Sequence, residues 1–88
     1  MTRLTRKESP KRRIACYAFD QVMSLDVTGP LQVFASANAE LTRQGNPPLY
    51  DLVIFAEKAG PVMTSAGIKL YADLTRADID PAEMDTIL

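Results

Sequence analysis

The residues best placed to do chemistry lie in the stretch SLDVTGPLQVFASAN, residues 24–38, where Asp26 comes shortly before Gly29 and Pro30. The Asp26 carboxylate could cap a helix by accepting backbone N–H bonds. It could instead act as a catalytic carboxylate at the carboxyl end of a strand, or be an ordinary exposed loop residue. Gly29 permits a close backbone approach, and Pro30 suits the first turn of a helix. Residue types and spacing leave all three interpretations of Asp26 open.

The sequence holds a single cysteine, Cys16, and no histidine. Without histidine, neither a Ser-His-Asp set nor a Cys-His pair can form within these residues. Cys16 lies in an apolar run, so we expect a buried structural thiol rather than a nucleophile. The same residue counts argue against a zinc site, and the sequence has no phosphate-binding glycine loop. We therefore expect no metal and no cofactor.

The elements that must position Asp26 follow the order strand, helix, strand. The apolar run 12–19 predicts a buried parallel strand, and the run 50–57 predicts a second, central one. Between them, residues 30–44 predict a helix with apolar side chains on one face, ended by Gly45 and the prolines that follow. This pattern predicts a βαβ unit of an α/β protein.

The second half of the chain is less regular. Residues 60–74 predict two short antiparallel strands around a turn at 65–67, and residues 75–83 predict a short helical or turn segment. Residues 84–88 begin another apolar strand, and parallel sheets need both faces covered. We therefore expect a partial doubly wound parallel sheet, truncated within a domain.

Charge is distributed unevenly along the chain. Residues 1–13 carry six basic residues and one acidic residue, a net charge of +5, and the remainder carries a net charge of −6. We interpret residues 1–11 as a basic flexible tail. Such a tail can contact nucleic acid or an acidic surface, but the lack of interleaved aromatic residues makes it weak evidence for DNA binding. No apolar run reaches the length of a membrane span, and the first residues lack a secretory signal. These features predict a cytoplasmic protein without a membrane partner.

Three segments resemble the ThiJ/PfpI superfamily, which is class I glutamine amidotransferase-like and flavodoxin-like in fold: residues 13–38, 50–74 and 78–88. The most specific part is the pattern LD-x-x-GP-x-x-VF, met by Leu25, Asp26, Gly29, Pro30, Val33 and Phe34. The chain looks most like AraC-type transcriptional regulators that carry such a domain. The resemblance covers about residues 12–88 and corresponds to the N-terminal half of that domain.

The resemblance implies roles for these residues. In enzymes of the superfamily, an acidic residue at the position of Asp26 contacts a cysteine on a later nucleophile elbow, and Cys16 does not match that cysteine. In a regulator, the same pocket would bind a small effector. The resemblance thus implies that Asp26, Gly29 and Pro30 bind a ligand.

Two functions follow from the resemblance. The first is the effector-binding and dimerisation part of an AraC-type regulator, which would contact DNA only through a C-terminal helix-turn-helix domain. The alternative is a fragment of an isocyanide hydratase or amidase, in which Asp26 assists a cysteine nucleophile beyond residue 88. We expect the 88-residue chain itself to be catalytically inert and to form homo-oligomers.

Overall fold

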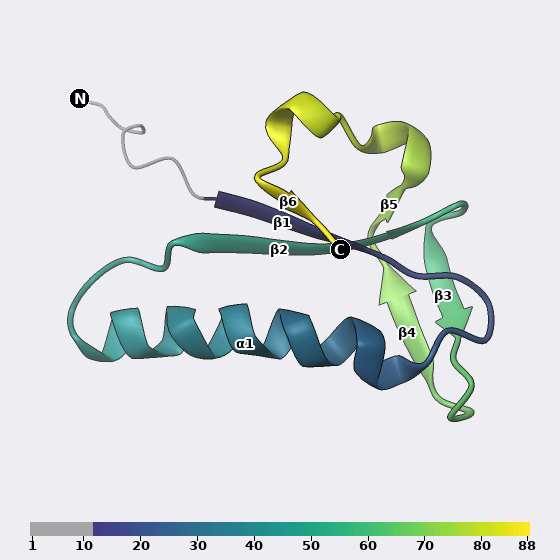
Figure 1. Ribbon diagram of the computed structural model, residues 1–88, viewed down its shortest axis with the longest axis horizontal. Coiled ribbons are helices and arrows are strands. Elements are labelled where there is room, and N and C mark those ends of the chain that lie inside the picture. Colours follow the sequence, from purple (N-terminus) through teal and green to yellow (C-terminus); the bar gives the residue numbers. More distant parts are fainter. Residues whose placement is uncertain (1–11) are drawn as a thin grey trace.

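The computed structural model describes residues 12–88, and the predicted basic tail, 1–11, lies outside the described residues (Figure 1). The elements follow the predicted order of strand, helix and strand before a less regular second half. In chain order they are β1 (Arg12–Tyr17), α1 (Ser24–Arg43), β2 (Tyr50–Ala56), β3 (Gly60–Met63), β4 (Lys69–Ala72), β5 (Leu74–Thr75), the 3₁₀ turns η1 (Arg76–Asp78) and η2 (Pro81–Glu83), and β6 (Thr86–Ile87).

The main sheet has four strands in the order β5-β2-β1-β6, all of them parallel. Residues 12–17 of β1 pair in continuous register with residues 50–55 of β2. From β1 the chain adds β2 on one side, and β6 returns to pair on the other side of β1. This reversal of direction is the mark of a doubly wound sheet, so the predicted fold class is confirmed.

The two faces of the sheet are covered differently. Figure 1 shows α1 along one face, while the segment containing η1 and η2 lies on the opposite side of the sheet. The core lies on the α1 face, where Val27 packs with Cys16, Ala18 and Ala56, and Leu31 and Ile54 add partly buried side chains. Burial of this apolar surface supplies most of the favourable free energy that holds α1 to the sheet.

Helix α1 begins at Ser24, six residues before the predicted start at residue 30. The prediction was wrong because it placed Pro30 in the first turn, whereas Pro30 lies in the interior of the helix. The helix extends toward its N-terminus because Val27, one turn before Leu31, completes the apolar face and is almost fully buried. Across residues 12–88, no helix has both the length and the apolar character to cross a membrane.

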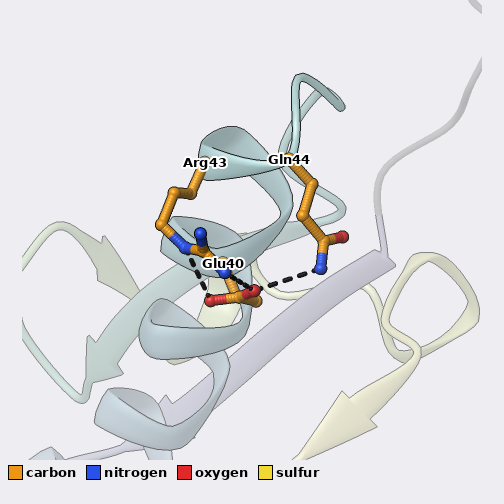
Figure 2. A network of polar contacts seen from close by, with 3 residues as sticks. All are labelled: Glu40, Arg43 and Gln44. Atoms are coloured by element: carbon orange, nitrogen blue, oxygen red, sulfur yellow. Dashed lines mark hydrogen bonds and ion pairs between the residues drawn. The ribbon is translucent and has the colours of Figure 1, made fainter.

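The C-terminal end of α1 matches the sequence prediction. Gly45 has a φ of 85°, and its N–H donates to the Thr42 carbonyl at 3.0 Å, while Asn46 N–H donates to the Leu41 carbonyl at 2.9 Å. These bonds form a Schellman motif, which satisfies the last carbonyls of the helix. On the predicted polar face, Glu40 accepts hydrogen bonds from Arg43 and from Gln44 (Figure 2).

The second half contains one element that the sequence pattern did not reveal. The antiparallel pair β3–β4 and the two short helical turns are confirmed, and β6 forms within residues 84–88. The strand β5 was missed because the residues between the turn at 65–67 and residue 74 were assigned to a single strand, and Thr75 was assigned to the helical or turn segment that follows. After Ala72 the chain leaves β4, Asp73 N–H bonds the Ile54 carbonyl at 3.0 Å, and Leu74 pairs with Phe55 of β2.

Candidate functional site

The carboxyl ends of the parallel strands lie at one edge of the sheet, where open α/β sheets bind their ligands. The loop that leaves β1 at this edge leads directly into α1, so the start of the helix belongs to the same edge. Asp26 is the third residue of α1 and is exposed. This is the edge at which Asp26 would lie if it were a catalytic carboxylate, one of the three interpretations left open by the sequence.

The capping interpretation of Asp26 is wrong. Met23 occupies the N-cap position with extended backbone, and no side chain caps this end of the helix. Among residues 12–88, no side chain forms a hydrogen bond or an ion pair with the Asp26 carboxylate. Its place in the first turn is still favourable, because the partial positive charge of the helix N-terminus attracts an anion. The carboxylate is therefore available to an external group.

Pro30 changes the backbone beside Asp26. In an α-helix, the N–H of residue 30 would donate to the carbonyl of residue 26, and proline has no N–H. The Asp26 backbone carbonyl is thus denied its usual helical donor. Gly29, which precedes the proline, has helical geometry that is disfavoured for residues with a Cβ in that position. The local backbone conformation therefore explains why a glycine stands at position 29, independently of any ligand.

The space around Gly29 does not require a glycine. A Cβ placed there would lie 3.7 Å from Leu25 Cδ1, an ordinary contact. Gly29 lines an open groove of about 520 Å³ along the outer side of α1, whose wall includes Leu25 and Val33. These two apolar side chains are 68% and 67% exposed. This groove brings Gly29 together with Leu25 and Val33. Neither Asp26 nor Pro30 lines this groove or any of the other three grooves described on residues 12–88.

A second polar cluster lies at the same sheet edge and was not predicted. Tyr17 ends β1, Glu57 directly follows β2, and Arg76 directly follows β5. The Tyr17 hydroxyl donates to Glu57 Oε2 at 3.2 Å, and Arg76 Nη1 lies 3.0 Å from the same oxygen. The Arg76 guanidinium carbon is 5.8 Å from the centre of the Tyr17 ring, within cation–π range.

The surroundings of Tyr17 favour its neutral form. Desolvation raises the pKa of the Tyr17 hydroxyl, and the hydrogen bond to Glu57 and the negative charge of that carboxylate raise it further. The positive charge of Arg76 acts in the opposite direction. The hydroxyl therefore stays protonated and serves as a hydrogen-bond donor. Each member stands at the end of a parallel strand, a signal that becomes readable only once the strand order is known.

Cys16 lies on the α1 face of β1 and is 2% exposed. Burial raises the pKa of its thiol, which keeps the sulfur protonated and weakly nucleophilic. The predicted structural role of Cys16 is therefore supported. Within residues 12–88, no three carboxylate or cysteine side chains come together in a group that could hold a metal ion.

No family model and no curated protein sequence matches the chain. Among solved structures, the chain is similar to a DJ-1 superfamily protein from Agrobacterium tumefaciens, with a TM-score of 0.60 and 18% sequence identity. The match covers 86% of this chain, and the chain spans only 35% of that protein's length. At this identity the likeness shows the fold alone, an α/β fold with a parallel sheet similar to part of that protein.

Proposed function

We propose that this chain is the effector-binding part of an AraC-type transcriptional regulator, with the start of α1 as its binding site. The observation that carries the proposal is the contrast between Asp26 and Cys16. Asp26 offers an exposed carboxylate with no partner among residues 12–88. The thiol of Cys16, the single cysteine, is buried in the core. A polar group without a nucleophile favours binding over turnover.

The wider parts of the proposal rest on the sequence resemblance. The regulator would act in the cytoplasm as a homo-oligomer and would contact DNA through a C-terminal helix-turn-helix domain. Residues 12–88 contain a single α-helix, α1, so this part of the chain supplies no helix-turn-helix pair. Effector binding and dimerisation are the roles left for it.

The alternative is the isocyanide hydratase or amidase activity. The Asp26 carboxylate, which has no partner among residues 12–88, favours it, because such a group could orient a thiol by hydrogen bonding. The thiol would have to come from outside these 88 residues, since Cys16 lies within β1 and is inaccessible. Both proposals therefore predict that the 88-residue chain binds small ligands near Asp26 without turnover, and they differ in what a longer chain would do.

The test is to titrate the 88-residue chain with small amide ligands and with cyclohexyl isocyanide. Binding is monitored through the NMR signals of the backbone N–H groups. We expect shifts in residues 24–30 and no formation of N-cyclohexylformamide. The affinity should be at least about tenfold lower in Asp26→Asn, as for loss of one charge-assisted hydrogen bond. The matched control, Glu83→Gln, removes an exposed carboxylate elsewhere and should bind normally. Turnover by a chain that extends beyond residue 88, abolished by Asp26→Asn, would favour the enzyme, whereas turnover by the 88-residue chain itself would contradict both proposals. Absence of any shift at 24–30 would contradict both.

A further inference from the structure

A groove of about 350 Å³ opens between the loop that follows β1 and the beginning of β3. Its wall contains aromatic, acidic, basic and apolar side chains, among them Tyr17, Phe19, Asp20, Glu57, Lys58 and Met63. We propose that this groove binds an organic cation, a protonated amine or guanidinium carried on an apolar group. The site is distinct from the start of α1, and this proposal stands independently of the Asp26 site.

The backbone fixes the walls of the groove before any ligand arrives. Gln21 N–H donates to the Met63 carbonyl at 2.7 Å, and Ser65 N–H donates to the Val22 carbonyl at 2.9 Å. These bonds join the loop after β1 to the β3 side, as Figure 1 shows for the two segments. Gln21 has a φ of 68°, a left-handed conformation that is uncommon for a residue with a Cβ. A groove with fixed walls loses little entropy on binding.

The aromatic rings supply the first half of cation recognition. The Tyr17 and Phe19 ring centres lie 5.9 Å apart, with 32° between their planes, and Phe19 is 52% exposed. The face of an aromatic ring attracts a cation through its quadrupole. The protein already uses this attraction, because the Arg76 guanidinium lies over the Tyr17 ring. A second cation entering the groove would meet the same chemistry at Phe19.

The carboxylates supply the second half. Asp20 and Glu57 line the groove with one basic residue, Lys58, so the lining itself carries a net charge of −1, and Arg76 forms an ion pair with Glu57 from outside the lining. Glu57 uses Oε2 for both Tyr17 and Arg76, and no donor among residues 12–88 bonds its Oε1. That oxygen can accept an N–H bond from an ammonium or guanidinium group. Residues 14–88 together carry an excess of acidic side chains, which also favours a cation.

Three probes of matched shape test the proposal on the 88-residue chain: phenethylamine, the neutral phenethyl alcohol and the anionic 3-phenylpropionate. We expect phenethylamine to shift the amide NMR signals of residues 17–21 and 57–63 and to bind at least about fivefold more tightly than either analogue. Equal binding of the alcohol would show an apolar groove without charge recognition. Tighter binding of the anion would assign the groove to Lys58. Either result, or no shift at millimolar concentration, overturns the proposal.

Two variants with opposite expected effects separate recognition from damage to the fold. Glu57→Gln removes the counter-charge and should weaken phenethylamine binding about fivefold. Arg76→Gln removes the cation that competes for Glu57 and Tyr17, so it should strengthen binding about two- to threefold. Tyr17→Phe keeps the ring and should retain binding. Equal affinities in Glu57→Gln and Arg76→Gln would contradict the proposal even if both variants fold normally, and Glu83→Gln again serves as the control.

Discussion

The side-chain amide of Asn38 hydrogen-bonds both the backbone N–H and the backbone carbonyl of Tyr50. Asn38 Oδ1 accepts from the Tyr50 N–H at 2.9 Å, and Nδ2 donates to the Tyr50 carbonyl at 2.8 Å. The same Oδ1 also accepts from the Leu49 N–H at 3.0 Å. A side chain in the C-terminal half of α1 thus holds the first residue of β2. The Phe34 ring also packs edge-on against the Tyr50 ring, with 4.8 Å between the ring centres.

Replacing Asn38 should therefore destabilise the fold. In Asn38→Ala, three hydrogen bonds are lost and partly buried backbone groups of residues 49–50 are left without partners, which costs about 2 kcal/mol in the free energy of unfolding. Urea denaturation followed by circular dichroism measures the change. Asn46→Ala, at an exposed position after the helix, is the matched control and should change stability by less than about 0.5 kcal/mol. Equal losses in the two variants would contradict the assignment.

Cys16 should resist alkylation in the folded chain. Its side chain is buried in the core and burial raises its thiol pKa, so the reactive thiolate is both rare and inaccessible. We expect iodoacetamide to modify Cys16 at least about a hundredfold more slowly in native buffer than in concentrated urea, because modification requires opening of the structure. Intact mass spectrometry follows the reaction. Rapid modification in native buffer would show that the thiol is exposed and would contradict its assignment as a buried structural residue.

The pH dependence of the η1 turn follows from Asp78. Its Oδ2 accepts from the Thr75 N–H at 2.9 Å and from the Thr75 hydroxyl at 2.8 Å, and these hydrogen bonds lower the pKa of the Asp78 carboxyl. A lowered folded-state pKa means that this local stabilisation is present above the pKa of an unfolded aspartate, about 3.9. It is lost as the pH falls through the folded-state value.

An NMR titration of the Thr75 amide tests this dependence. We expect its chemical shift to stay constant from neutral pH down to about pH 4 and to change only below that point. In Asp78→Asn the acidic transition should vanish from the Thr75 signal, because the titrating group is gone. A transition in the Thr75 amide that is centred above the ordinary aspartate value would contradict the assignment.

Much of the fold follows from local pattern, and the misses have physical causes. The runs that became β1 and β2 were recognisable because strands buried on both faces are continuously apolar. Gly45 marked the end of α1 because a left-handed residue is needed there. The start of α1 was misplaced because proline usually begins helices, and here burial of Val27 outweighs the cost of Pro30 in the interior.

The candidate site was less predictable than the fold. Asp26 could be placed at the sheet edge because it follows a strand at short distance and precedes a helix. The cluster of Tyr17, Glu57 and Arg76 could not, because its members are 40 and 19 residues apart and meet only through strand register. The register pair Ala56 and Thr75 brings Glu57 and Arg76 next to each other. Side-chain sites that depend on sheet register are invisible until the strand order is known.

Pro30 offers a test of whether the start of α1 is shaped for stability or for binding. A proline inside a helix removes one backbone hydrogen bond and crowds the preceding turn, at a cost of about 3 kcal/mol. Pro30→Ala restores the donor to the Asp26 carbonyl, so it should raise the free energy of unfolding by about 1 kcal/mol or more. Thermal and urea denaturation measure this gain.

The matched control is Ala35→Pro, which places a proline five residues further along the same helix and should destabilise the chain by about 3 kcal/mol. If Pro30→Ala stabilises the chain but weakens ligand shifts at residues 24–30, the proline serves binding at the expense of stability, as functional sites often do. A loss of stability in Pro30→Ala would show instead that α1 needs the fixed φ of Pro30 to pack Val27 against the sheet.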